Sequence, residues 1–131
     1  MSFKIHTLDH ASVLPIEEQP CSAIQPQVGM AMVMSGGLLV KATGTTKPTY
    51  ICVTQRAAAV EAGELVQVIP NDGGTILETE FAADATAIKC GDKVTIHTDA
   101  MSVTATTNGG IAEVVHMSGT AQGSTCRVRF R

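Results

Sequence analysis

Apolar and polar residues alternate with a period of two along most of the chain after Gly29. This alternation predicts short β-strands, because successive side chains of a strand point to opposite faces. The clearest case is the last segment, residues 125–131, where Cys126, Val128 and Phe130 share one face and arginines occupy the other. No segment of ten or more residues shows a convincing helical period. We therefore predict an all-β fold with helix limited to single turns.

Turns rich in glycine divide the chain into short segments of this kind. The strands predicted after Gly29 are residues 30–34, 38–43, 50–55, 65–69, 75–81, 93–98, 102–107, 111–116 and 125–131. The pairs Gly36-Gly37, Gly73-Gly74 and Gly109-Gly110 lie in turns and precede no helix, so they cannot form a nucleotide-binding loop. Many short strands joined by such turns predict a small antiparallel β-barrel or sandwich.

Residues 91–130 loosely repeat residues 29–69. The matched pairs are Gly29 and Gly91, Met32 and Val94, Met34 and Ile96, Val40 and Val103, Ala42 and Ala105, Val53 and Val114, Gly63 and Gly123, Val66 and Cys126, and Val68 and Val128. Apolar positions match and polar positions do not, which indicates a shared strand scaffold rather than a shared site. We predict two similar strand units within a single β domain, residues 28–131, whose pairing removes exposed strand edges.

Residues 1–27 have a different character from the rest of the chain. Pro15, Pro20 and Pro26 punctuate this region, and its apolar residues follow no sustained period. Because proline favours extended backbone around it, we predict an extended N-terminal arm with a short strand at residues 3–8. A segment that packs on the barrel of its own chain fits the same pattern, and both interpretations stay open.

Composition narrows the range of functions. Apolar residues make up 44% of the chain but aromatic residues only 3%, so the core must be mainly aliphatic. The formal net charge of −3 gives no electrostatic footprint for nucleic acid. No apolar run is long enough to span a membrane, and the N-terminus lacks the apolar centre of a signal peptide. We therefore expect neither a nucleic acid nor a membrane as a direct partner.

The residues that most often carry catalysis or bind metals are scattered. The four cysteines are Cys21, Cys52, Cys90 and Cys126. They form no C-x-x-C motif, and no histidine lies at ligand spacing from them. No histidine belongs to a known nucleophile motif, and G-x-S-x-G is absent. We expect free buried thiols, no metal site, no cofactor and no enzymatic activity.

One charged pattern is prominent, on the outer face of the last predicted strand. It consists of Arg127, Arg129 and Arg131. A protein that binds single-stranded nucleic acid would place aromatic platforms beside such a stripe, but Tyr50 is the only tyrosine and the chain has no tryptophan. We expect a solvated strand face or a contact with an acidic protein surface.

Two stretches of the chain resemble head decoration (cement) proteins of tailed bacteriophages. The first, residues 29–53, reads GMAMVMSGGLLVKATGTTKPTYICV, and the second, residues 119–130, reads GTAQGSTCRVRF. The resemblance covers residues 29–131. It implies a structural virion protein, made in the host cytoplasm, that binds the outer surface of an assembled capsid and stabilises contacts between major capsid subunits. Family members act as trimers, dimers or monomers, so a homotrimer is one expected state.

Under this interpretation we expect the N-terminal arm to hold the capsid, since extended apolar segments lie in grooves or add a strand to a neighbouring sheet. The candidate contact residues are Phe3, Ile5, Leu8, Leu14 and Ile16. The competing interpretation is a small β-barrel module of a cytoplasmic protein that binds a ligand or RNA. Co-sedimentation with capsids favours the first, and a stability shift with nucleotide or RNA favours the second.

Overall fold

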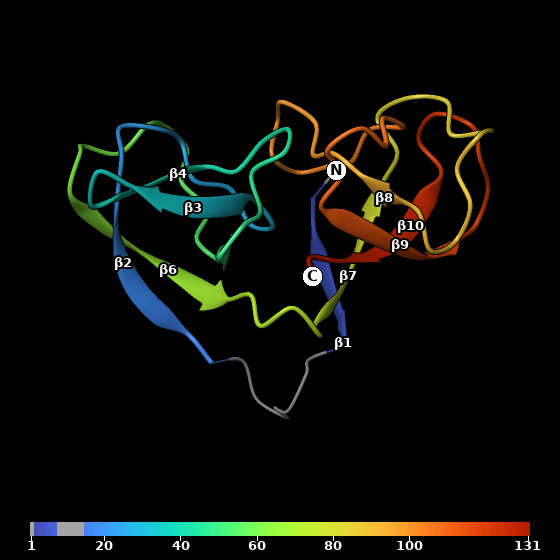
Figure 1. Ribbon diagram of the computed structural model, residues 1–131. Coiled ribbons are helices and arrows are strands. Elements are labelled where there is room, and N and C mark those ends of the chain that lie inside the picture. The colour runs from blue at the N-terminus through green and yellow to red at the C-terminus, as the bar shows by residue number, and fades with distance from the viewer. Residues whose placement is uncertain (1, 8–14) are drawn as a thin grey trace.

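The computed structural model describes residues 2–7 and 15–131, and this part of the chain contains β-strands and no helix. The strands are β1 (Lys4–Thr7), β2 (Glu17–Cys21), β3 (Ala31–Ser35), β4 (Leu38–Lys41), β5 (Tyr50–Cys52), β6 (Glu64–Pro70), β7 (Ile76–Glu80), β8 (Lys93–Val94), β9 (Ala112–Met117) and β10 (Thr125–Arg129). They form two lobes that lie side by side (Figure 1). The all-β prediction is confirmed.

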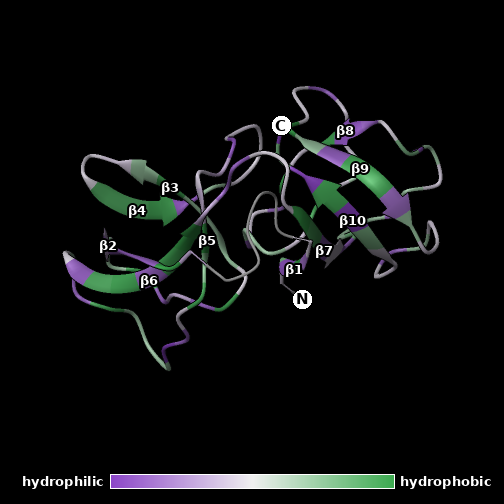
Figure 2. Ribbon diagram, turned by 90° about the horizontal axis from the view of Figure 1, so that it is seen from below, coloured by the Kyte–Doolittle hydropathy of each residue, from purple (hydrophilic) through white to green (hydrophobic). Residues whose placement is uncertain are grey.

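The first lobe is a closed barrel with the strand order β2-β4-β3-β5-β6. Its strands pair antiparallel except at one place, where Cys21 of β2 meets Leu39 of β4 in parallel and closes the ring. The hydrophobic stretches of β4, β5 and β6 are visible in Figure 2. The fully buried side chains that these strands contribute are Cys21, Ala31, Met32, Leu39, Ile51, Cys52, Val66, Val68 and Ile69.

The second lobe is a sheet with the strand order β1-β7-β10-β9-β8. The chain beyond β8 extends it, because Ile96 bridges Val103 antiparallel and Val103 bridges Phe81 in parallel, directly after β7. These bridges bring the segment around Val103 back to the first strand of the unit. The second lobe is therefore also wrapped like a barrel, with β1 added on the side of β7 that β10 does not occupy.

The two lobes use the same pairings, about sixty residues apart. Met32–Tyr50 in the first lobe corresponds to Val94–Ala112 in the second. In the same way, Cys52–Val68 corresponds to Val114–Val128, and Cys21–Leu39 corresponds to Phe81–Val103. Hydrogen bonds in the turns repeat as well: the amide of Gly63 donates to the carbonyl of Cys21, as that of Gly123 donates to Phe81, both at 2.8 Å. The repeat therefore includes β2 and β7, and it begins earlier than the apolar pattern indicated. Two of the matched pairs also shift by one residue: Leu39 rather than Val40 is equivalent to Val103, and Cys52 rather than Val53 is equivalent to Val114.

The division of the chain into an arm of residues 1–27 and a domain of residues 28–131 needs correction. β2 pairs with β6 over its whole length, from Glu17 to Cys21, and so belongs to the first barrel. β1 pairs with β7 and belongs to the second lobe. Both segments are extended, as expected, but they pack on their own chain. Polar residues and Pro20 interrupt the period-two pattern in β2, so its pairing with β6 could not be recognised from alternation.

The two lobes are joined by backbone contacts, and an aromatic pair of the second lobe lies beside these contacts. Gly44 and Ile96 exchange two hydrogen bonds of 2.8 and 3.0 Å, and the amide of Ala31 donates to the carbonyl of Ala100 at 2.8 Å. The ring of Phe3 packs edge-on against Phe130, with 5.2 Å between the ring centroids. These contacts reach from both ends of the chain into one seam, so the lobes share a continuous core.

The seam requires a glycine at position 29. The amide of Phe3 donates to the carbonyl of Gly29 at 3.0 Å. A Cβ atom at this position would lie 2.6 Å from the Cβ atom of Ser2 and 2.7 Å from the carbonyl oxygen of Phe3. The φ angle of Gly29 is +87°, a backbone conformation that residues with a side chain rarely adopt. The glycine that opens the repeat therefore also lets the N-terminal strand approach.

The alternation within residues 93–98, 102–107 and 125–131 predicts five core residues, all of which are buried, but several predicted strands are shorter than expected, two of them strongly. These core residues are Val94, Ile96, Val103, Val128 and Phe130, each at most 2% exposed. Only Lys93–Val94 of the predicted strand 93–98 forms β8, and the predicted strand 102–107 forms bridges at Val103 alone. The same alternation predicts that Thr95 faces outward, between Val94 and Ile96, but Thr95 is buried, and its hydroxyl shares a hydrogen bond of 2.7 Å with that of Thr104.

Substitution of the buried N-terminal aromatic residue tests this arrangement. Phe3→Ala should lower the free energy of unfolding by about 3–5 kcal/mol, because it empties a buried aromatic site. The side chain of the next residue, Lys4, is exposed. Lys4→Ala should therefore change the free energy of unfolding by less than about 0.5 kcal/mol. Urea denaturation measures both variants. Equal small losses would mean that the N-terminal strand does not contribute to the core.

Candidate functional site

The structure places the predicted capsid-contact residues in different environments. Phe3 is only 2% exposed and fills the seam, so it is not available to a partner in this structure. Ile5 is half-buried against the core, while Ile16 is 50% exposed just before β2. Leu8 and Leu14 lie outside the described residues. Of the described candidates, Ile5 and Ile16 therefore keep surface that a partner could cover.

An apolar groove borders the seam beside β1. It has a volume of about 360 Å³, and both the N-terminal strand and β5 contribute to its walls. The residues that line it are Ser2, Phe3, Lys4, Ile5, Val28, Gly29, Ile51, Cys52 and Val53. Val28, at its rim, is 50% exposed. Sequence reasoning missed this groove because residues far apart in the chain form its two sides.

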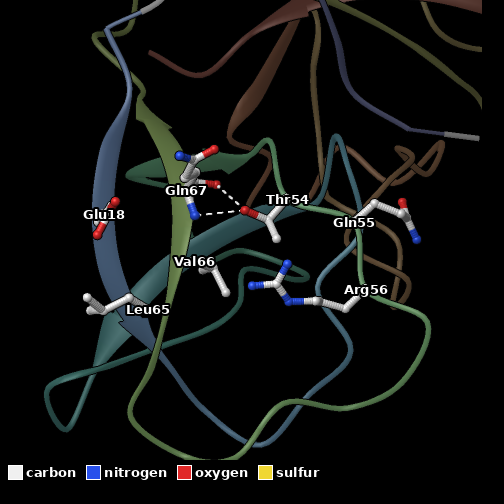
Figure 3. Close-up of a pocket in the computed structure, with 7 residues that line it drawn as sticks. All are labelled: Glu18, Thr54, Gln55, Arg56, Leu65, Val66 and Gln67. Carbon is white, nitrogen blue, oxygen red and sulfur yellow. Dashed lines mark hydrogen bonds between the residues drawn. The ribbon is translucent and has the colours of Figure 1, made fainter.

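A second groove, on the first barrel, is polar. Its lining residues, shown in Figure 3, are Glu18, Thr54, Gln55, Arg56, Leu65, Val66 and Gln67, and its volume is about 420 Å³. The Thr54 hydroxyl accepts a 2.7 Å hydrogen bond from the Gln67 amide and donates to the Gln67 carbonyl at 3.2 Å. Arg56 pairs with Glu64 at 3.6 Å. Thr54 and Arg56 thus have partners within the barrel, and among the residues that line this groove no nucleophile lies beside a base.

The basic stripe of β10 is neutralised within its own sheet. Arg127 pairs with Glu78 of β7 at 3.4 Å, and Arg129 pairs with Glu113 of β9 at 2.5 Å. Arg131 is exposed at the end of the chain. Arg127 and Arg129 are therefore engaged in ion pairs within the sheet. This arrangement fits the expected solvated strand face better than a contact with an acidic protein surface.

The ion pair between Arg129 and Glu113 sets the pKa of the carboxyl group. The hydrogen bond from Arg129 lowers the pKa of Glu113 below its ordinary value of 4.5, and the positive charges of Arg129, Arg131 and Lys93 act in the same direction. A lowered pKa in the folded state stabilises the fold above the ordinary pKa. That stabilisation is lost as the pH falls through the folded-state pKa.

All four cysteines are free, but they are not all buried. Cys21, Cys52 and Cys126 are buried, whereas Cys90 is exposed, which corrects the expectation of four buried thiols. Burial raises the pKa of the Cys126 thiol to about 12, with a further contribution from Glu78 and Glu80. Burial also raises the pKa values of Cys21 and Cys52.

The described residues contain no cluster of three or more histidine, cysteine, aspartate or glutamate side chains that could hold a metal ion. They also contain no helix long and apolar enough to cross a membrane. No family model matches this chain, and no curated protein matches it. The grooves and the open surfaces of the two lobes are thus the features from which a function has to be argued.

The Glu113 ion pair predicts a component of acid sensitivity. Glu113→Gln should lower the free energy of unfolding at pH 7 by at most about 1 kcal/mol, as for a partly exposed ion pair. Below about pH 4.5 the wild-type protein should lose this advantage, because protonation removes the charge of the carboxylate. Urea denaturation of both proteins at pH 7 and pH 3 measures the difference. A constant difference at the two pH values would contradict the assignment.

Thiol accessibility gives an independent check of the core. One thiol per chain, that of Cys90, should react rapidly with a disulfide reagent in the folded protein, and four should react in denaturant. The buried thiols should be slow, because they are shielded and their raised pKa values keep them protonated. A Cys90→Ser variant should show no rapid reaction. Rapid reaction of that variant would mean that a barrel opens readily.

Proposed function

We propose that this protein binds the outside of an assembled bacteriophage capsid and stabilises contacts between major capsid subunits. The observation that carries the proposal is the pair of equivalently built barrels in one chain. A capsid surface consists of many copies of one subunit, so equivalent binding surfaces recur on it at fixed distances. A protein with two similar lobes in a fixed arrangement is suited to bind two such surfaces at once.

The seam supplies the rigidity that this role requires. Backbone hydrogen bonds between Gly44 and Ile96, and between Ala31 and Ala100, hold the lobes against one another. Because the lobes are not joined by a flexible linker alone, binding of the first lobe positions the second. The second contact then forms at a high effective concentration, which raises the overall affinity without strong individual contacts.

The apolar groove beside β1 is the surface that we assign to the capsid. Exposed apolar surface next to a groove is typical of protein-binding sites. Ile5 lines this groove and Val28 stands half-exposed at its rim. We thus still assign capsid binding to the N-terminal segment, as expected from the sequence. The segment contributes as a strand of the fold, however, and not as a free arm.

Co-sedimentation with capsids tests the proposal. The full-length protein should pellet with mature capsids that lack a decoration protein, saturate at a fixed ratio to the major capsid subunit, and raise the temperature at which the capsids rupture. Val28→Glu should weaken this binding at least tenfold, because it places a charge at the apolar groove. Met34→Glu, at another exposed apolar position, is the matched control and should bind normally.

Two outcomes would contradict the proposal. One is wild-type protein that stays in the supernatant with mature capsids. The other is a protein whose melting temperature rises with nucleotide or RNA and not with capsids, which would favour the small ligand- or RNA-binding module. If wild-type protein and both variants bind equally, the capsid role stands but its assignment to the groove is wrong.

A further inference from the structure

Comparison of the two lobes reveals a position that is filled in one and open in the other. In the second lobe, β7 lies between β10 and β1. β1 covers the edge of β7 through the pairs Lys4–Glu78, Ile5–Leu77 and Thr7–Ile76. The strand equivalent to β7 in the first lobe is β2, because each begins its unit and closes its ring through one parallel contact.

β2 has no counterpart of β1 among residues 2–7 and 15–131. One side of β2 pairs with β6 from Glu17 to Cys21. The other side meets β4 only at Cys21. Ile16, Glu17 and Glu18 are exposed. Within the described part of the chain, the first lobe therefore presents a short free strand edge at the place where the second lobe binds an extra strand.

We propose that this free edge of β2, residues 16–19, accepts an extended segment of a partner protein as an added β-strand, with a basic side chain of that segment facing Glu18. An exposed strand edge carries unpaired amides and carbonyls that bind extended peptides in this way. This assignment stands on the repeat and holds whatever particle the protein decorates.

The backbone of β2 has the orientation that strand addition requires. The carbonyl of Cys21 accepts a hydrogen bond from Gly63, on the side of β6. Backbone polar groups alternate in direction along a strand, so those of Gln19 face β6 and those of Glu18 face the free edge. Pro20 has no amide hydrogen and sits where a donor toward that edge would be, as is usual for proline in edge strands. The free edge consequently ends before the contact with β4.

The side chains of the two edges indicate the chemistry of the partner. Ile16 and Glu18 occupy the positions of Ile76 and Glu78, so the two edges carry the same residues there. In the second lobe Glu78 lies between Lys4 of β1 and Arg127 of β10.

Glu18 has Gln67 opposite it on β6, and no strand formed by the described residues lies on its other side. The partner segment should therefore place a cation opposite Glu18, as the register of β1 places Lys4 opposite Glu78, next to an apolar residue such as Phe3 or Ile5.

A second copy of this chain is not the occupant that the structure favours. Each chain has one β1 and two edges that fit it. The β1 strand of each chain already pairs with β7 of the same chain, and the contact between Phe3 and Phe130 holds it there. A β1 strand donated to a neighbour would uncover the donor's own β7, so exchange between copies gains no pairing. A strand from a different protein adds pairing without this loss.

A synthetic peptide of residues 2–7, added to isotopically labelled full-length protein, tests the edge. Amide chemical shifts should change for residues 16–19 and for their β6 partners, and not for β7. Peptide carrying Lys4→Glu should bind at least about threefold more weakly, in the range of one cross-strand charge pair. Protein carrying Glu18→Lys should likewise lose affinity for the original peptide and regain it for the Lys4→Glu peptide. Glu17→Lys is the matched control, because its side chain faces away from that of Glu18.

The possible outcomes separate the alternatives. Rescue of binding by the charge swap supports the proposal and does not require that Glu18→Lys leave stability unchanged. Shifts centred on β7 would mean that the peptide only displaces β1, and no shifts at millimolar peptide would mean that the edge accepts no strand; either result overturns the proposal. Self-association of the full-length chain in analytical ultracentrifugation, abolished by Glu18→Lys, would overturn it in favour of a second copy.

Discussion

Each lobe depends on one short parallel contact. Several strands pair with their neighbours in sequence, but such pairs alone leave a sheet with two free edges. The contact between Cys21 and Leu39 closes the first ring, and the contact between Phe81 and Val103 does the same in the second. Each of these residues is buried, so closure and core formation occur at the same place. The seam, the grooves and the free edge of β2 are all positioned by these two contacts.

The hairpins could be predicted from the sequence, whereas the closing contacts could not. Alternating side chains on both sides of Gly36-Gly37 mark the β3–β4 hairpin, because strand periodicity and turn residues are local signals. β2 lacks such a signal, since its outer residues are polar and it contains Pro20. Its pairing with β6 is a tertiary effect that overrides weak local preference. The shortening of β8 is a tertiary effect as well: after Val94 the chain leaves β9, and Ile96 forms isolated bridges with Gly44 and Val103 instead.

The environments of side chains were likewise predictable where they depend on one strand and not where they depend on distant contacts. The burial of Val128 and the half-exposure of its neighbour Arg129 follow from the period of one strand, and they were predicted correctly. The ion pair of Arg129 with Glu113 requires the register between β9 and β10, which no single segment specifies. The burial of Phe3 requires contact with Phe130 at the opposite end of the chain. An aromatic residue in an aperiodic segment gives no indication of so distant a partner.

The position of β1 has a consequence for the order in which the chain folds. The strands of the first barrel lie within residues 17–70, so this lobe contains all its own pairing partners before the second lobe has been synthesised. β1 is made before β2 but must wait for β7, and Phe3 must wait for Phe130, which follows β10. Contacts between such distant residues form slowly, because a long loop must close first. The strand that precedes both lobes in the sequence is thus among the last to find its place.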